Sequence, residues 1–188
     1  MHSFRQELDR IINMYSEQLS SFLAVEKGTA KHRNPCAMFE TATEDTIFSA
    51  IMKEGRNLCS LRNLVNDGLK NAISGIMPNA CDLAGEEISL DMLSAAGSLK
   101  KLAELPSGSI QVMGAEKALF KHKREGSPSP KHGFIFKYPG ISVIPRGKRG
   151  KVARFIASRL AIAFRADYFG RKIDTEQMKL EIKRRITQ

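Results

Sequence analysis

Apolar residues recur at helical spacing over two long stretches in the first half of the chain. From about Ser3 to Val25 they follow one another at intervals of three and four, which predicts an amphipathic helix. The same periodicity runs from about Glu44 to Ile76 and predicts a second helix, and the intervening EKGTAKHRNPC is typical of a connector. Two such helices bury their apolar stripes either as an antiparallel hairpin or by coiling with a partner.

Beyond Pro78 the periodic stretches become shorter. Asn79 can cap a helix that begins there, and helix breakers follow at Gly85, Gly97 and Pro106. PSGSIQVMG and AEKALFKHK predict two more short helices that meet at Gly114, and REGSPSPKHG predicts a loop.

The C-terminal part of the chain alternates an irregular run with two helices. His132 to Pro145 is interrupted by Pro and Gly and predicts an extended or irregular segment. Lys148 to Phe169 predicts a long helix, and Asp174 to Ile186 a charged one capped by Asp174 or Thr175. Because no strand pattern or repeat is present, we predict an all-α fold, with a coiled-coil-like hairpin over residues 1–77 and a compact helical domain over residues 78–188.

Charge is strongly polarised along the chain. From Lys117 to Gln188 there are 19 Lys and Arg against 5 Asp and Glu, whereas the remaining residues carry a net charge of −4. This distribution favours a polyanionic partner for the C-terminal part. A basic surface that serves solubility remains an alternative. An acidic membrane surface is disfavoured, because interfacial helices need a stripe of exposed large apolar residues.

The composition disfavours several other classes of protein. The three cysteines, Cys36, Cys59 and Cys81, show no metal-ligand spacing and predict buried or idle thiols in a reducing compartment. No secretory signal opens the chain and no apolar stretch approaches membrane-helix length, so we expect a soluble intracellular protein without membrane association. No phosphate loop, dinucleotide fingerprint, nucleophile arrangement or metal cluster is recognisable. We therefore predict no catalytic residue, metal or cofactor.

The predicted helix over Lys148–Phe169 separates basic from apolar positions. On a helical wheel the basic and polar positions fall within about 60° of one another, and they are Lys151, Arg154, Ser158 and Arg165. The apolar positions lie roughly 140° away, and they are Val152, Ile156, Leu160 and Ala163. Arg146, Lys148 and Arg149 surround Gly147 at the helix start, where free backbone N–H groups also favour anions. An ordinary solvated basic face is the alternative interpretation.

Three blocks of the sequence, taken in order, resemble the Nop domain family. IQVMGAEKALFKH is similar to the signature stretch of that family, and PKHGFIFKYP is similar to its next block. RGKVARFIASRLAIAFRADYFG is similar to its final helix. The likeness begins around PNACDLAG and covers about 110 residues.

The resemblance implies a helical module that binds a composite surface. In this family the module docks where a small kink-turn-binding protein sits on kinked RNA and touches both. Members act in box C/D ribonucleoproteins, which guide ribose 2′-O-methylation in RNA processing, and one relative acts in the spliceosome. We therefore expect an RNA-binding assembly protein, cytoplasmic in an archaeon and nuclear or nucleolar in a eukaryote.

The resemblance also implies where RNA contacts lie. Gly114 to Lys117 match the family's Gly-Ala-Glu-Lys element, Lys131 or His132 matches a position beside the RNA, and the last helix contributes basic residues. The predicted RNA-binding residues are Gly114, Ala115, Glu116, Lys117, Lys121, Lys131, His132, Lys148, Arg149, Lys151, Arg154 and Arg165.

General chemistry is compatible with these assignments. Gly114 lets the backbone approach a ligand, and Lys117 can reach phosphate. Glu116 would repel phosphate, so we expect it to cap a helix or hold a neighbouring cation. His132 can stack on an unpaired base, although a structural histidine bonded to backbone is the alternative.

One departure from the family concerns the N-terminus. Box C/D members carry an additional domain that binds fibrillarin, whereas this chain begins almost directly at the hairpin. Fibrillarin binding through this chain alone is therefore not expected, and the shorter hairpin weakens the expectation of dimerisation through a long coiled coil. A natural short protein and a piece of a longer one are both compatible with this beginning.

Two other functions remain as alternatives. One is a protein-interaction scaffold, or a regulatory protein with only the Nop domain and no role in methylation. The other is general DNA binding, which is disfavoured because no element matches a known reading head.

Overall fold

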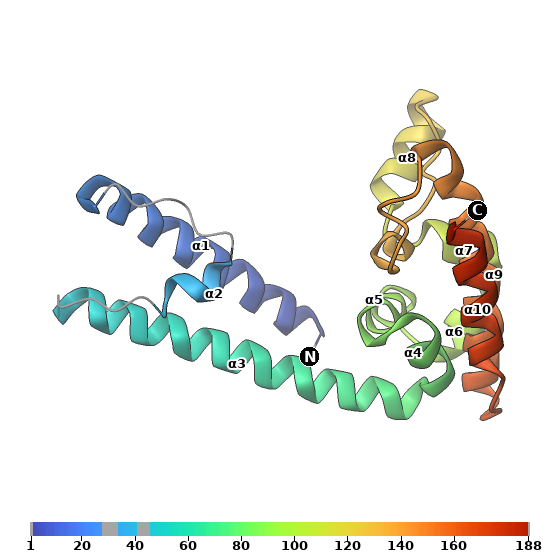
Figure 1. Cartoon of the computed structure of the whole chain (residues 1–188), viewed down its shortest axis with the longest axis horizontal. Coiled ribbons are helices and arrows are strands. Elements are labelled where there is room, and N and C mark those ends of the chain that lie inside the picture. The colour runs from blue at the N-terminus through green and yellow to red at the C-terminus, as the bar shows by residue number, and fades with distance from the viewer. Residues whose placement is uncertain (1, 28–33, 41–45, 188) are drawn as a thin grey trace. The chain divides into compact units, whose positions relative to one another are not determined.

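The computed structural model describes residues 2–27, 34–40 and 46–187 of the chain. Throughout these ranges the regular structure is helical and contains no strand, which confirms the predicted all-α fold (Figure 1). The elements are α1 (His2–Lys27), α2 (Pro35–Met38), α3 (Thr46–Ile76), α4 (Pro78–Ala84), α5 (Glu86–Ala96), α6 (Leu99–Glu104), α7 (Ser107–Val112), α8 (Glu116–Glu125), the 3-10 helix η1 (Phe134–Lys137), α9 (Arg146–Tyr168) and α10 (Thr175–Thr187). They form two compact units, Met1–Leu69 and Lys70–Gln188.

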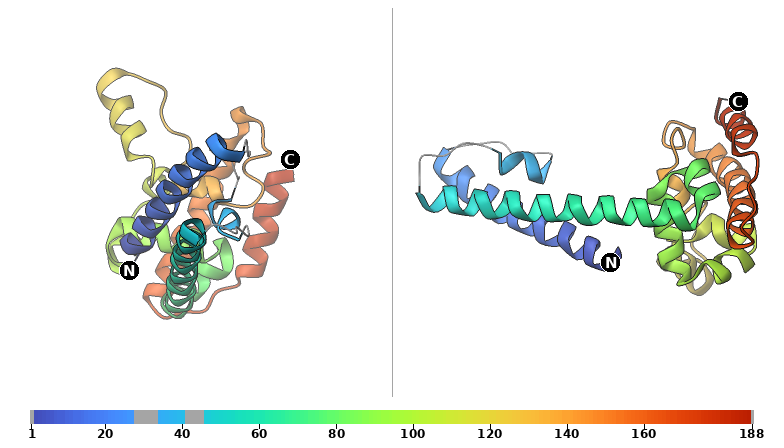
Figure 2. Two further views of the ribbon diagram at one scale, coloured as in Figure 1. Left: turned by 90° about the vertical axis from the view of Figure 1, so that its left-hand side faces the viewer. Right: turned by 90° about the horizontal axis from the view of Figure 1, so that it is seen from below.

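The first unit is a helical hairpin. Figures 1 and 2 show α1 and the N-terminal part of α3 side by side and antiparallel. Of the two arrangements that the sequence left open, the hairpin is therefore the one observed. Its core is made of Ile12, Leu19, Met38, Phe39, Met52 and Cys59.

The segment between the two long helices contributes to this core. We predicted a plain connector, but α2 begins inside it at Pro35, and the connector's residues 28–33 and the predicted helix start at Glu44 lie outside the described residues. Phe39 follows α2 and is fully buried, and a Cβ at Gly55 would lie 2.3 Å from its ring. Glycine inside a helix costs about 1 kcal/mol of stability relative to alanine. Gly55 is needed in α3 despite this cost, because any larger residue would collide with the Phe39 ring.

The prediction of idle thiols is wrong for two of the three cysteines. Cys36 and Cys59 form a disulfide that joins α2 to α3 across a sequence separation of 23 residues. Nothing in their spacing indicated this pair, because the two sulfur atoms meet only once α2 folds back onto α3. Cys81 is free and buried, as predicted, and burial raises the pKa of its thiol.

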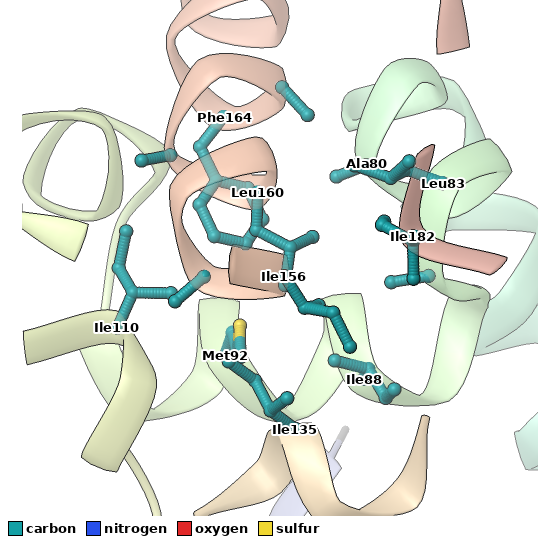
Figure 3. Close-up of a cluster of buried hydrophobic side chains, with 14 of the residues drawn as sticks. Ala80, Leu83, Ile88, Met92, Ile110, Ile135, Ile156, Leu160, Phe164 and Ile182 are labelled. Atoms are coloured by element: carbon teal, nitrogen blue, oxygen red, sulfur yellow. The ribbon is translucent and has the colours of Figure 1, made fainter. Parts of the chain in front are cut away.

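The second unit is built around α9. Figure 3 shows Ile156, Leu160 and Phe164 of this helix among side chains from the surrounding helices. The labelled neighbours are Ala80 and Leu83 of α4, Ile88 and Met92 of α5, Ile110 of α7, Ile135 of η1 and Ile182 of α10. All of these side chains belong to one buried core.

The division between the two units falls within α3, whereas the sequence suggested a boundary at Pro78. The last turns of α3 belong to the second unit because Ile73 is buried in its core together with Met77. None of the helices in the described ranges combines the length and the apolar character needed to cross a membrane.

The start of α4 is capped from a distant part of the chain. We expected Asn79 to be the cap, but Pro78 occupies the first turn and no side chain at the N-cap residue Met77 bonds to the helix. Instead, the buried carboxylate of Asp167 accepts hydrogen bonds from the backbone amides of Asn79 (2.9 Å) and Ala80 (3.0 Å). The helix start is thereby fastened to the C-terminal part of α9.

The remaining elements of the second unit complete its surface. The run from His132 to Pro145, predicted to be irregular, contains η1 and a series of turns. Helix α8 has no buried residue, and in the left view of Figure 2 it projects away from the other helices of the unit. Asp174 caps α10 by accepting a hydrogen bond from the Gln177 amide (3.0 Å), which decides between the two caps that the sequence allowed.

Candidate nucleic-acid interface

The Gly-Ala-Glu-Lys element forms the turn between α7 and α8. Gly114 has a φ of +87°, and a Cβ there would lie 2.7 Å from the Phe134 ring. Its amide donates a hydrogen bond to Glu116 Oε1 (2.7 Å), so Glu116 bonds back to the turn before α8. The helix cap that we expected is not formed, because the N-cap residue Ala115 has no side-chain cap. The glycine is thus required by the fold itself. Lys117 is exposed, and its ammonium group has no ion-pair partner among the described residues.

The segment that carries Lys131 and His132 is attached to the end of α7. The Gly133 amide donates a hydrogen bond to the Gln111 carbonyl (3.0 Å), and a Cβ at Gly133 would lie 1.9 Å from the Met113 oxygen. Because Gly133 has no side chain, the segment can pass directly over the end of α7. Lys131 is exposed beside this contact, and its Nζ lies 3.5 Å from the Arg146 carbonyl oxygen.

His132 stacks on an aromatic neighbour within its own segment. Its ring lies 4.7 Å from that of Phe136, between centroids, at an interplanar angle of 17°. Burial lowers the pKa of the imidazole, and the charges of Arg149 and Lys131 lower it further. The lowered pKa favours the neutral form of this half-buried imidazole, which suits stacking more than ion pairing.

Arg149 is engaged by the fold more than we predicted. Its Nε donates to the Ile144 carbonyl (2.7 Å) and its Nη2 to the Ser142 carbonyl (2.7 Å). Its guanidinium group also lies 5.6 Å from the centroid of the Phe136 ring. These contacts hold the turn before α9 against η1. Lys148, one position earlier, is exposed at the start of α9, where no side chain caps the helix.

The two faces of α9 are those that the sequence pattern predicted. Val152, Ile156, Leu160 and Ala163 are buried. Lys151, Arg154 and Arg165 are exposed and Ser158 is half-buried, and we call these four residues the cationic stripe. Arg154 donates from Nε to Gln111 Oε1 (3.4 Å), which leaves its Nη groups available. Lys151 has no hydrogen-bond or ion-pair partner among the described residues.

The fold brings most, but not all, of the predicted residues together. Helix α7 packs against both α9 and η1, and α9 packs against η1. The Gly114–Lys117 turn, the Lys131–His132 segment and the first half of α9 are therefore neighbours. Two predicted residues lie apart from them. Lys121 is on α8, with Glu125 4.0 Å away, and Arg165 donates to the Ala103 carbonyl of α6, about 16 Å along α9 from Arg154.

Several acidic side chains of the second unit pair with cations outside the proposed interface. Lys137 pairs with Asp91 and Glu87, Arg159 with Glu181, and Lys179 with Asp82 and Glu176. Among the described residues none of these carboxylates bonds to Lys117, Lys151 or Arg154. In the same ranges no three His, Cys, Asp or Glu side chains form a group that could hold a metal ion.

Two residues of this region were not predicted from the sequence. Gln111 lies in the signature block but was not assigned a role, because its partners are 20 to 43 positions away. Phe136, which supports both His132 and Arg149, lies four positions after His132, and that spacing is a signal that could have indicated it.

Comparison with known proteins gives consistent matches over nearly the whole chain. The family model described as "Nop: snoRNA binding domain, fibrillarin" matches residues 9–188. An uncharacterised NOP5 family protein from Methanocaldococcus jannaschii is 42% identical over 139 residues, covering 72% of this chain and 34% of that protein. Nucleolar protein 58 of Schizosaccharomyces pombe is 31% identical over 162 residues, which cover 85% of this chain and 32% of that protein.

A solved structure has the same fold. The crystal structure of a fibrillarin/Nop5p complex matches with a TM-score of 0.71 and 34% identity, over 98% of this chain and 64% of that chain. This chain spans about a third of the length of the two curated relatives. The match of the family model and the agreement in fold lead to one conclusion: this chain belongs to the Nop family.

Proposed function

We propose that this chain is a non-catalytic, RNA-binding component of a ribonucleoprotein, which recognises kink-turn RNA together with a small kink-turn-binding protein. One observation supports the proposal most: the segments that carry Lys131 and Arg154 both bond to Gln111 of α7, and no carboxylate among the described residues pairs with either cation. Arg154 retains the paired Nη donors that suit a phosphate, and Lys117 and Lys151 add point charges.

The expected RNA is folded and contains unpaired bases. A neutral, stacked His132 suits contact with a base, whereas the surrounding cations suit the backbone phosphates. Single-stranded loops and kinks of RNA present both groups together. This combination favours a kinked RNA over a regular duplex.

The wider context of the proposal comes from the family. The expected ribonucleoproteins are those of the box C/D type, which guide 2′-O-methylation of RNA. The solved relative is named for a complex with fibrillarin, but fibrillarin binding through this chain alone is not proposed. Several eukaryotic relatives are named nucleolar proteins, so we expect the nucleolus in a eukaryote and the cytoplasm in an archaeon.

The decisive experiment measures binding to a kink-turn RNA, alone and after the small kink-turn-binding protein has been added. We expect tighter binding to the preformed complex than to either component, because the proposed surface contacts both. A duplex DNA of equal length serves as competitor and should displace little of the RNA. Equal binding to RNA and duplex DNA, or no binding with both components present, would contradict the proposal.

A second candidate function is a protein-interaction scaffold. It is favoured by the first unit, whose helices leave large apolar side chains exposed at Phe4, Ile11, Met14, Leu61 and Leu64. Retention on immobilised RNA separates the two functions, because a scaffold without RNA binding would show no salt-dependent retention.

A further inference from the structure

A single buried amide side chain bonds to two of the segments that carry the proposed RNA contacts. Gln111, in α7, is 7% exposed. Its Nε2 donates to the carbonyls of Lys131 (2.7 Å) and Gly150 (3.3 Å), and its Oε1 accepts from Arg154 Nε (3.4 Å). Its backbone carbonyl accepts from the Gly133 amide (3.0 Å).

The chemistry of these partners defines the side chain required at position 111. Two backbone carbonyls need donors, and the Arg154 Nε–H needs an acceptor, so one group must supply both. A carboxylate would face the two carbonyls without a hydrogen to donate, and an aliphatic chain would remove all three hydrogen bonds at once. Among side chains of this length, an uncharged amide meets every requirement.

We infer that Gln111 is the positioning residue of the interface, and that it sets the Lys131–His132 segment and Arg154 in register for a common RNA. Gln111 itself is too deeply buried to touch the ligand. Because its oxygen binds Nε of Arg154, the guanidinium plane is oriented with its Nη groups outward. Because its nitrogen binds the Lys131 carbonyl, the preceding loop is held over α7. This inference rests on the proposed function.

The test is a double-mutant cycle on RNA affinity, measured by titration of kink-turn RNA with the small kink-turn-binding protein present, at one salt concentration. Gln111→Met keeps the shape and removes the hydrogen bonds. We expect it to weaken RNA binding about 5- to 30-fold. In the Arg154→Ala background, Gln111→Met should weaken RNA binding clearly less than it does in the parent, because the two residues act together. Combined with Arg165→Ala, which bonds to α6, the two effects should multiply.

A matched control separates positioning from a general loss of stability. Asn79 is another buried amide of the second unit, bonded to Asp167 and to the Arg171 carbonyl. Asn79→Leu should lower the melting temperature and leave the RNA affinity of the folded protein within twofold of the parent. If Gln111→Met does not fold, Gln111→Glu takes its place in the cycle, since it keeps an acceptor for Arg154 and loses both donors.

The outcomes distinguish this inference from the function on which it rests. If the parent binds RNA and Arg154→Ala weakens binding, but the position-111 variant binds like the parent, the positioning role is wrong and the proposed function stands. Equal effects of the position-111 variant with Arg154 present and absent would also overturn it. If the parent binds no RNA, or the variants at Arg154 and Lys151 bind unchanged, the proposed function itself fails.

Discussion

Asp167 near the end of α9 closes the first turn of α4 at Asn79, 88 residues earlier in the chain. One carboxylate oxygen accepts hydrogen bonds from the backbone amide (2.9 Å) and the side-chain amide (2.7 Å) of Asn79. The other oxygen accepts from the Ala80 amide (3.0 Å). The pair joins α9, which presents the cationic stripe, to α4, the first helix that lies wholly within the second unit.

This relationship predicts a large and specific loss of stability. Asp167→Ala should lower the free energy of unfolding by about 2–4 kcal/mol, because several buried donors lose their acceptor at once. Asp174→Ala, which removes the exposed cap of α10, should cost about 1 kcal/mol at most. Urea denaturation followed by circular dichroism measures both losses, and equal values would contradict the assignment.

The RNA contacts should be concentrated on the cationic stripe. Arg154→Ala should weaken RNA binding by about 1–3 kcal/mol, whereas Lys183→Ala, an exposed position of α10, should cost at most roughly a few tenths of a kcal/mol. Both variants should fold, because neither side chain belongs to the buried core. RNA titrations at fixed salt compare them with the parent. Equal losses would indicate a diffuse cationic field without a defined site.

Affinity for RNA should fall steeply with salt. If five or six basic residues engage phosphates, counterion release gives a slope of log affinity against log salt of about −4 to −5. Titration at several salt concentrations yields the slope, and Lys151→Ala should reduce its magnitude by about one. A slope near zero would mean that the charge polarity serves solubility alone.

The ion pairs of Lys137 should stabilise η1 in a pH-dependent manner. Burial alone lowers the pKa of Lys137, but hydrogen bonds to Asp91 and Glu87 outweigh it and raise the pKa above its ordinary value. Because the pKa of Lys137 is higher in the folded than in the unfolded protein, its ion pairs stabilise the fold fully at pH values below the unfolded-state pKa. This stabilisation is lost as the pH rises through the folded-state pKa. The parent should therefore lose stability above about pH 10.5, and Lys137→Met should lose less over that range. Denaturation from pH 7 to 11 compares the two, and identical pH profiles would exclude the effect.

The three cysteines should react differently with an alkylating reagent. Cys81 should resist modification in the native protein, because it is buried and its thiol pKa is raised by burial. Cys36 and Cys59 should become reactive only after reduction, since they are linked. Peptide mass spectrometry before and after reduction and unfolding reads out each residue. Free Cys59 in the native, unreduced protein would contradict the disulfide.

The sequence alone determined the helical fold and the two faces of α9. Both depend on periodicity, and a repeat of 3.6 residues places Ile156 and Leu160 on the buried side and Lys151 and Arg154 on the exposed side without reference to any other element. The signature blocks likewise indicated the family, because they are local and occur in order.

Only the tertiary structure decided which distant groups meet. The Cys36–Cys59 disulfide, the closure of α4 by Asp167 and the contacts of Gln111 all join residues separated by 20 positions or more. The role of Arg149 was also decided by the tertiary structure. Its charge suggested phosphate binding, but its guanidinium group donates hydrogen bonds to the Ser142 and Ile144 carbonyls. Local patterns report how a residue faces its own helix. The partner of a buried polar group depends on how the helices pack, and only the folded chain specifies that packing.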